Sequence, residues 1–239
     1  MKKIVIASLI LGSVGAVRAQ GVAEGYAVTA DLAYASQYVF RGIRHANDSV
    51  QPSVEFGFEN AYAGIWSNQP LQSHRTGEVD AYAGYKYSVT KTWSFEVVGS
   101  YYDYPGATGG RVGFSYEMGL GATYLVRGVS ASIYYYRDFK LDANTEQGSL
   151  AYSIPLKASG GSIDCTVYVG TVQSADGLAI SIQRTRQSYN YYGVDLTLPY
   201  KLSEKTSVAA GVHWADRDGW TAPDGNNHLW FTVSLTHAF

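Results

Sequence analysis

From residue 27 to residue 239 the chain alternates apolar and polar residues with a period of two, segment after segment. This period puts successive side chains on opposite faces and is typical of β-strands with one apolar face. About twelve such segments follow one another, separated by turn-forming residues and with almost no helical periodicity between them. The pattern therefore predicts an all-β fold.

Residues 1–19 have the composition of a cleaved export signal. Two lysines precede an apolar run at 4–17, and Ala19 supplies the small residue after which we expect cleavage. A retained membrane helix is the alternative, but the run is short and interrupted by glycine. No Cys follows it, which argues against a lipoprotein-type anchor. The sequence thus predicts a signal peptide at 1–19 and one domain at 20–239.

Beyond Ala19 no apolar run approaches the roughly 18 residues of a membrane helix. A membrane-embedded mature chain would therefore have to be a closed β-barrel, since a barrel also satisfies every backbone group. The connections alternate in length, as in bacterial transmembrane meanders, whereas a soluble β-sandwich with Greek-key links has no reason to alternate. The short connections are those near residue 60 and at 90–92, 126–128, 157–161 and 201–205. The mostly longer connections are those at 41–49, 69–76, 105–110, 137–144, 173–188 and 216–227.

Aromatic residues fall where the edges of a membrane would lie. The chain has 21 Tyr, and amphipathic rings collect at membrane interfaces. Rings near the short turns are Tyr85, Tyr87, Trp93, Tyr124, Tyr200 and Phe239, and rings near the longer loops are Tyr101, Tyr135 and Trp214. Ordinary enrichment of Tyr in strands explains the number of rings better than their placement. We therefore expect a transmembrane antiparallel meander β-barrel of about 12 strands.

The final segment, 229–239, is a period-two strand that ends on an aromatic residue. Such an ending resembles the C-terminal signal by which outer-membrane barrels are recognised for assembly, and we assign that signal to Leu235 and Phe239. His237 departs from the usual apolar pattern. An edge strand of a soluble sandwich would also fit this segment alone, but after an export signal we expect it to close a barrel onto the strand at 27–40.

Several short motifs in the first half resemble one bacterial family. They are Ser-Gln-Tyr-Val-Phe-Arg-Gly at 36–42, Gln-Pro at 51–52, Tyr-Ala-Gly-Ile-Trp-Ser-Asn at 62–68, Glu-Val-Asp-Ala-Tyr-Ala-Gly-Tyr at 78–85 and Tyr-Tyr-Asp-Tyr-Pro-Gly at 101–106. Together they resemble the TorF-type porin family, also known as the Gcw_chp conserved hypothetical outer-membrane proteins. From about residue 128 onward only the strand pattern is similar. The resemblance implies an exported outer-membrane barrel and brings no established substrate or catalytic residues.

If the apolar face contacts lipid, the polar face lines the lumen. Charged side chains on the lipid face would each cost about 2–4 kcal/mol at mid-depth, so this sorting is meaningful. The candidate pore-lining residues are Asp31, Glu55, Glu78, Asp80, Lys86, Glu96, Arg111, Glu117, Asp164 and Asp195. An excess of acids would favour cations in a water-filled pore. Alternatively, these acids pair with Arg and Tyr of neighbouring strands and fill a narrow interior.

Basic residues gather instead in the longer loops and at the adjoining strand ends. They are Arg41, Arg44, Arg75, Arg137, Arg184, Arg186 and Arg217. A basic rim could attract anions or bind the phosphates of lipopolysaccharide, although such charges are more often simply solvated.

Enzymatic and metal-binding motifs are absent from the sequence. The five His are scattered, and no paired-Cys or His-Glu-x-x-His spacing occurs. A catalytic role of His213 with Ser207 or Asp216 has no motif behind it, and the Asp216, Asp218 and Asp224 cluster is a weak cation signal. The single Cys165 excludes an intramolecular disulfide. We expect that the protein is not an enzyme and that it binds no cofactor and no metal.

Charge gives no reason to expect a nucleic-acid partner. Loss of Lys2, Lys3 and Arg18 with the signal peptide leaves 15 basic and 20 acidic residues, a net charge of −5. We expect an outer-membrane channel for passive diffusion of small solutes or ions, with a cation preference. Its expected partners are outer-membrane lipid and lipopolysaccharide, the barrel-assembly machinery and small solutes. The alternative is a non-conducting structural or surface-interaction barrel.

Overall fold

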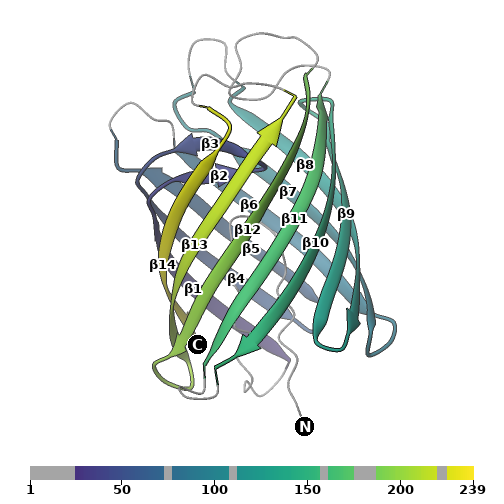
Figure 1. The fold of residues 1–239 in the computed structure, drawn as a ribbon, viewed down its shortest axis with the longest axis vertical. Coiled ribbons are helices and arrows are strands. Elements are labelled where there is room, and N and C mark those ends of the chain that lie inside the picture. Colours follow the sequence, from purple (N-terminus) through teal and green to yellow (C-terminus); the bar gives the residue numbers. More distant parts are fainter. Residues whose placement is uncertain (1–24, 73–76, 108–111, 157–160, 175–186, 220–224) are drawn as a thin grey trace.

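Twelve long strands form one closed antiparallel barrel in the computed structural model (Figure 1). The structure describes residues 25–72, 77–107, 112–156, 161–174, 187–219 and 225–239, so the predicted signal peptide lies outside the described residues. The barrel strands are β1 (Tyr26–Ala35), β4 (Ser49–Phe58), β5 (Ala61–Pro70), β6 (Glu78–Ser88), β7 (Trp93–Asp103), β8 (Phe114–Val126), β9 (Val129–Asp138), β10 (Ala143–Pro155), β11 (Ser162–Ser174), β12 (Gln187–Lys201), β13 (Thr206–Asp218) and β14 (His228–Ala238). The predicted twelve-strand meander is confirmed.

The last strand closes the barrel onto the first. β14 pairs antiparallel with β1, from Thr29 opposite Ala238 to Ala35 opposite Thr232. Two further backbone bonds lie beyond this ladder: the amide of Phe239 donates to the carbonyl of Val28, and the amide of Ser36 donates to the carbonyl of Phe231, both at 3.0 Å. Closure leaves no strand edge with unpaired backbone groups. The strand predicted at 229–239 therefore has the expected partner.

The two ends of the barrel differ in their connections. We call the turn end the one with the connections at 59–60, 89–92, 127–128, 156–161 and 202–205, where Gly25 and Phe239 also lie. The opposite, loop end has the connections at 36–48, 71–77, 104–113, 139–142, 175–186 and 219–227. Their places along the chain agree with the predicted connections, although two of the loop-end segments differ in extent or structure. Residues 175–186 of the connection predicted at 173–188 lie outside the described residues.

One loop-end connection is shorter than predicted. A polar loop was expected at 137–144, but β9 extends to Asp138 and β10 begins at Ala143. The Asp138 carboxylate accepts hydrogen bonds from the amides of Lys140 and Leu141, at 2.9 and 2.7 Å. It thereby satisfies the backbone of a tight turn that the polar composition alone did not reveal.

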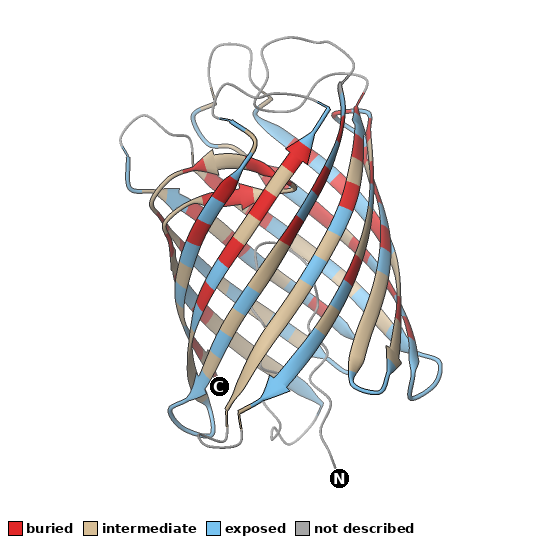
Figure 2. Cartoon of the chain, in the orientation of Figure 1, coloured by how far each residue is buried: buried red, intermediate tan, exposed pale blue. Residues whose placement is uncertain are grey.

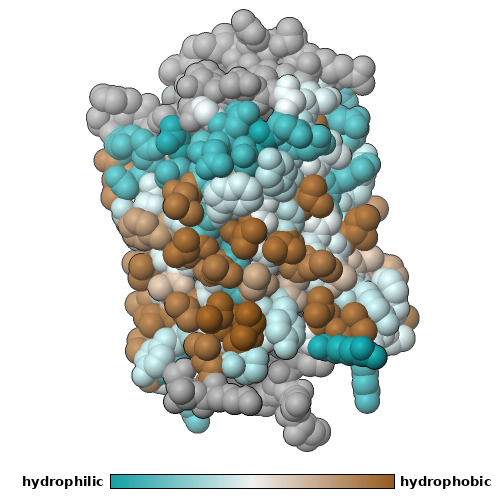
Figure 3. All heavy atoms as spheres, in the orientation of Figure 1, coloured by the Kyte–Doolittle hydropathy of each residue, from teal (hydrophilic) through white to brown (hydrophobic). Residues whose placement is uncertain are grey.

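Residues of differing burial alternate along the wall strands (Figure 2), as expected when successive side chains point to opposite faces. The outward positions are largely apolar and exposed, among them Leu32, Val54, Phe56, Ile65, Leu120, Ile133, Leu150, Val169, Leu198, Val212 and Phe231. Figure 3 shows apolar side chains over the middle and turn-end part of the visible wall, and hydrophilic ones towards the loop end. An exposed apolar surface of this extent is unusual for a monomer in water.

Outward-facing aromatic rings lie at both ends of the wall, as predicted for rings at the two edges of a membrane. Trp93 and Tyr124 pack with ring centroids 4.7 Å apart near the turn end, and Tyr101 and Phe114 pack at 5.8 Å near the loop end. Cys165 also lies on the outward face, beside Leu196 of β12. None of the described residues forms a helix long and apolar enough to cross a membrane.

Many other tyrosines point into the barrel, although the sequence analysis places Tyr at the membrane interfaces. On three strand pairs an inward Tyr ring lies over a glycine of the adjacent strand. The pairs are Tyr62 with Gly84 and Tyr82 with Gly64 (β5 and β6), Tyr134 with Gly121 and Tyr136 with Gly119 (β8 and β9), and Tyr168 with Gly193 and Tyr191 with Gly170 (β11 and β12). In each pair a Cβ on the glycine would overlap the tyrosine side chain. The glycines therefore let large rings lie flat against the inner wall.

These contacts predict a position-specific effect of adding one methyl group. Gly121→Ala should destabilise the barrel by about 1–3 kcal/mol, because the ring of Tyr134 has to move. The readout is the temperature at which the folded, fast-migrating species disappears in heat-modifiable gel electrophoresis. Gly99→Ala on β7 is the matched control, since a Cβ there meets nothing within 4 Å. Equal melting temperatures for the two variants would contradict the ring-over-glycine account.

Candidate functional site

The predicted pore-lining residues share the inner face of the barrel. Nine of the ten lie on inward positions, in alternation with the exposed apolar residues: Asp31, Glu55, Glu78, Asp80, Lys86, Glu96, Glu117, Asp164 and Asp195. Arg111 lies outside the described residues. The lumen therefore brings together most of the charged side chains that the sequence singles out.

A hairpin that the sequence analysis missed occupies the lumen at the loop end. The end of the strand predicted at 27–40 forms β2 (Tyr38–Phe40), and the predicted polar loop at 41–49 contains β3 (Ile43–Ala46); both lie inside the barrel (Figure 1). The first strand also stops at Ala35 rather than continuing to residue 40, because the chain bends inward at 36–37. We call the segment 36–48 the plug hairpin.

The tip of the plug hairpin is a two-residue turn of unusual sequence. Arg41 and Gly42 have φ of 48° and 74°, and Phe40 pairs with Ile43 across them. Turns with positive φ at both central residues suit the twist of a two-stranded hairpin. A Cβ at position 42 would lie 2.9 Å from the Cβ of Tyr191, so only glycine fits there. Arg41 adopts an unfavourable backbone conformation, which the contacts of its side chain stabilise.

The plug hairpin contacts the barrel wall on several sides. Tyr38 and Ala46 pack with Trp66 of β5. Val39 packs with Ala215 of β13 and Trp230 of β14. Ile43 packs with Val172 of β11 and with Tyr189 and Tyr191 of β12. Strands far apart around the barrel thus contact one hairpin, which therefore spans the lumen.

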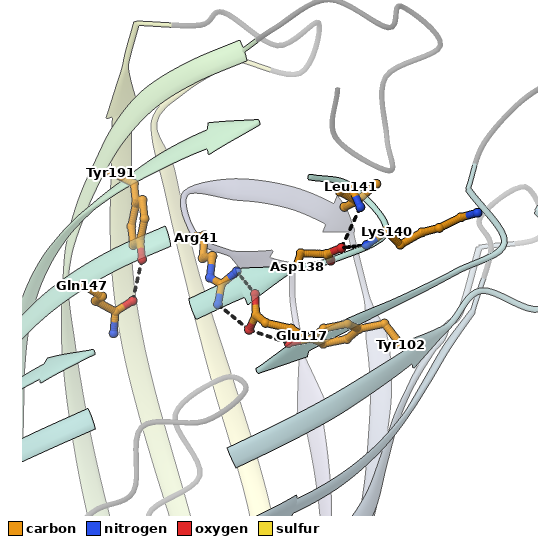
Figure 4. A network of polar contacts seen from close by, with 8 residues as sticks. All are labelled: Arg41, Tyr102, Glu117, Asp138, Lys140, Leu141, Gln147 and Tyr191. Carbon is orange, nitrogen blue, oxygen red and sulfur yellow. Dashed lines mark hydrogen bonds and ion pairs between the residues drawn. The ribbon is translucent and has the colours of Figure 1, made fainter. Parts of the chain in front are cut away.

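Arg41 links the hairpin tip to β8 by a buried ion pair (Figure 4). Its guanidinium donates to both carboxylate oxygens of Glu117, at 2.7 and 2.9 Å, and the two side chains are 14% and 4% exposed. The Tyr102 hydroxyl donates to the same carboxylate at 3.2 Å. The guanidinium also lies 4.7 Å from the ring centroids of Phe40 and Tyr136. Two-point binding and aromatic faces suit arginine better than lysine.

Tyrosine hydroxyls bind other carboxylates of the lumen. Glu96 accepts hydrogen bonds from Tyr62 at 2.6 Å and from Tyr134 at 2.5 Å. Glu55 accepts one from Tyr82 at 3.1 Å. These are the same rings that lie over glycines, so the packing that holds each ring also aims its hydroxyl. The acids at these positions therefore pair with tyrosines, as the alternative interpretation expects, but each tyrosine lies two strands away and not on a neighbouring strand.

Towards the turn end the lumen acids bind small hydroxyl side chains. Asp31 accepts from Thr236 at 2.6 Å, and Asp164 accepts from Ser153 and Ser162 at 2.5 and 3.0 Å. Inward residues of this half are mostly small and only partly buried, as Ser132, Thr166, Thr197, Ser207 and Ser234 are. The inner wall is therefore more open here than near the plug hairpin.

His213 belongs to a hydrogen-bonded chain inside the wall. Its Nδ1 lies 2.8 Å from Asp195 and its Nε2 lies 2.9 Å from Thr232, and its ring stacks on Trp230 at 5.2 Å. These partners differ from Ser207 and Asp216, the residues considered from the sequence. Fixed hydrogen bonds at both ring nitrogens suit a buried structural histidine.

The predicted basic rim is only partly a surface feature. Arg41 lies in the lumen, and Arg217 is 2% exposed and donates to Asn226 and to the carbonyl of Gly225. Arg137 faces outward and binds Asp142 and Asn144. Arg75, Arg184 and Arg186 lie outside the described residues. For Arg41 and Arg217, the interpretation as solvated loop charge is wrong, because buried carboxylate and carbonyl oxygens bind them.

Asp216 and Asp218 do not form the cation site for which the sequence of the last loop gives a weak signal. Asp216 binds the amide of Arg217 and the side chain of Asn227, and Asp218 binds Asn190, while Asp224 lies outside the described residues. Within the described ranges, no three or more His, Cys, Asp or Glu side chains are grouped as metal ligands.

The buried ion pair at the hairpin tip generates a testable prediction. Glu117→Ala should destabilise the protein by about 3–5 kcal/mol, because it leaves the Arg41 guanidinium buried without its carboxylate. Replacing both partners, as Arg41→Met with Glu117→Met, should recover most of that loss. The free energy of unfolding of detergent-refolded protein in urea measures both effects. A double variant no more stable than Glu117→Ala would show that the ion pair is not what the hairpin tip depends on.

Part of the sequence is similar to one family of bacterial proteins. Residues 19–125 match the model of a family described as "Bacterial protein of unknown function (Gcw_chp)", a match to less than half of the 239 residues. No curated protein matches the sequence.

Among solved structures, the KdgM porin in complex with disordered oligogalacturonate is similar, with a TM-score of 0.58 and 13% identity over 88% of this chain and 99% of KdgM. The NanC porin has a TM-score of 0.55 and 11% identity over 88% and 98% of the two chains. The COG4313 outer membrane channel from Pseudomonas putida F1 has a TM-score of 0.56 and 9% identity over 95% and 100%. The chain thus shares its fold with outer-membrane porins and channels, and its first half matches a bacterial family of unassigned function.

Proposed function

We propose that this chain is an outer-membrane channel that passively conducts small solutes or ions through a lumen narrowed by the plug hairpin. The observation that carries the proposal is the sorting of side chains by the closed wall. Apolar residues cover the outside, and charged and hydroxyl groups cover the inside. A wall of this kind suits lipid on one side and water or a polar solute on the other. The shared fold with porins supports the same function.

The resemblance to the TorF-type porin family agrees with this proposal, as does the predicted signal peptide at 1–19. We further propose that Leu235 and Phe239 are read by the barrel-assembly machinery. Leu235 on β14 and Phe239, one residue beyond that strand, are both exposed, and Phe239 lies at the turn end. Recovery in the outer-membrane fraction, with heat-modifiable gel mobility, tests this location, and lipid and lipopolysaccharide would be the partners of the outer face.

Cation preference is part of the proposal. Among the described lumen residues, carboxylates outnumber Lys86, Arg41 and Arg217, and the Arg41 charge is balanced by Glu117. Fixed charge of one sign raises the local concentration of counter-ions in a narrow pore. Asp164, near the turn end and only partly buried, and Glu55, also partly buried, are the acids best placed to act on a passing ion.

The contacts of the plug hairpin support a second candidate function, that of a barrel that does not conduct. The plug hairpin contacts β5, β8 and β11 to β14 and is held by a buried ion pair, as expected of a barrel that does not conduct. Such a barrel would act as a structural or surface-interaction protein. The two functions differ in whether any current passes.

Removing the plug hairpin should raise the conductance several-fold. Ala35 and Ser49 are paired across β1 and β4, so an Asn-Gly turn can replace 37–47 without altering the wall. Single-channel recording in a planar bilayer compares this variant with the wild type. An Asn-Gly replacement of 139–142, which shortens another loop-end connection, is the control. If neither the wild type nor the hairpin replacement gives discrete steps, the channel proposal fails; if both give the same steps, the hairpin does not limit conduction.

Selectivity can be tested in the same hairpin-replaced protein. Glu55→Gln with Asp164→Asn should move the reversal potential in a salt gradient towards zero, because two negative charges leave the lumen. Glu146→Gln is the matched control, since Glu146 lies exposed on the outer face of β10. A reversal potential that does not change on removal of the lumen acids would refute the cation preference and leave conduction itself intact.

A further inference from the structure

Two carboxylates at the loop end of β6 differ from the other acids of the lumen. Glu78 and Asp80 lie two residues apart on the inner face and are 3% and 0% exposed. Both carboxylate oxygens of Asp80 are enclosed without a hydrogen-bond partner among the described residues. Within that part of the chain, neither acid forms an ion pair. Asp80 thus differs from Glu96, which two tyrosines bind, and from Glu117, which an arginine binds.

A third oxygen-bearing side chain, that of Tyr38, reaches these two acids from the plug hairpin. The Tyr38 hydroxyl is enclosed within hydrogen-bonding range of the Glu78 carboxylate, which the Tyr104 hydroxyl also faces, and Tyr38 is 3% exposed. Tyr38 lies within electrostatic reach of both Glu78 and Asp80. Burial, together with these two negative charges, holds the pKa of Tyr38 well above its usual range, so the phenol stays neutral and offers a lone pair.

Rigid neighbours enclose this group of oxygens. Trp66 of β5 and Tyr102 of β7 are the cross-strand partners of Asp80, and the rings of Tyr38 and Trp66 pack 5.3 Å apart. Asn68, opposite Glu78, is fixed by a 3.0 Å hydrogen bond from Gln51. The oxygens are therefore held by packed side chains on the wall and on the hairpin, rather than by a loop.

Two buried carboxylates without a positive partner are unfavourable as they stand. Burying a single unpaired carboxylate already costs several kcal/mol, and two close together repel each other. The charge has to be balanced by protons or by a cation. Carboxylate and neutral oxygens are the ligands of hard cations such as Ca²⁺, which complete their coordination with water. Two carboxylates match the charge of one divalent ion.

We propose that Glu78, Asp80 and Tyr38 bind one hard divalent cation, for which Ca²⁺ is the probe, and that this ion fastens the plug hairpin to β6. The site uses oxygens that the Arg41–Glu117 pair does not use, so the hairpin has two separate attachments to the wall. It is independent of whether the barrel conducts.

Calcium binding to the purified full-length protein tests the proposal. After treatment with EDTA, equilibrium dialysis with radioactive Ca²⁺ at pH 8 should give one bound ion per barrel. Asp80→Asn and Glu78→Gln should each weaken binding by about tenfold or more, because each removes a ligand. Tyr38→Phe, which deletes only the hydroxyl, should weaken binding less. Glu146→Gln, which removes an exposed acid on the outer face of β10, is the control and should bind like the wild type.

A second readout separates a cation from a proton as the balancing charge. Ca²⁺ should raise the temperature at which heat-modifiable mobility is lost in the wild type, because it binds only the folded state. It should not do so in Asp80→Asn, whose folding the same gel verifies. Absence of Ca²⁺ uptake by the wild type, or equal uptake by Asp80→Asn, would overturn the proposal. Neither result bears on single-channel conductance, so the channel proposal stands or falls separately.

Discussion

Backbone pairing between β1 and β14 is the interaction on which the rest of the structure depends. Closure gives every wall strand two hydrogen-bonded neighbours, and it divides side chains into an outer and an inner set with no edge between them. Once the outer set is apolar, every charged group has to lie inside or beyond the ends. The lumen then has to satisfy carboxylates in a confined space, which explains the dense hydrogen bonding of Glu96, Glu117 and Asp31.

Tyrosine is the residue that reconciles packing with this polarity. A ring lying over a glycine fills volume against the wall, while its hydroxyl reaches a carboxylate on another strand. Where no tyrosine hydroxyl is available, arginine or small hydroxyl side chains take its place. The loop-end half of the lumen is consequently aromatic and crowded, whereas near the turn end the inward residues of β9 to β14 are mostly small and polar. The plug hairpin extends the crowded half with its own rings, Tyr38 and Phe40.

Much of the wall could be predicted from the sequence, and the plug could not. Alternation with period two fixes which residues face outward, so the inward positions of Asp80, Glu117 and Asp195 follow directly. The same rule gives no answer for 62–68, because Ile65 faces out while Tyr62 and Trp66 face in, and all three are apolar. Residues 36–40 look like the end of the first strand and the residues after them like a polar loop, since the ionic partner of Arg41 is 76 residues away. Only the Arg-Gly pair at the hairpin tip hinted at a tight turn.

The position of the plug hairpin in the chain has a consequence for how the barrel is built. It leaves the wall between β1 and β4, yet Ile43 packs against β11 and β12 and Val39 against β13 and β14. Those surfaces are made last if the chain adds strands in order. An early segment must therefore wait for late ones, so seating the hairpin and sealing the seam are a single cooperative event. Any intermediate lacking the final strands would have a wall already begun and a hairpin with half of its contacts still to make.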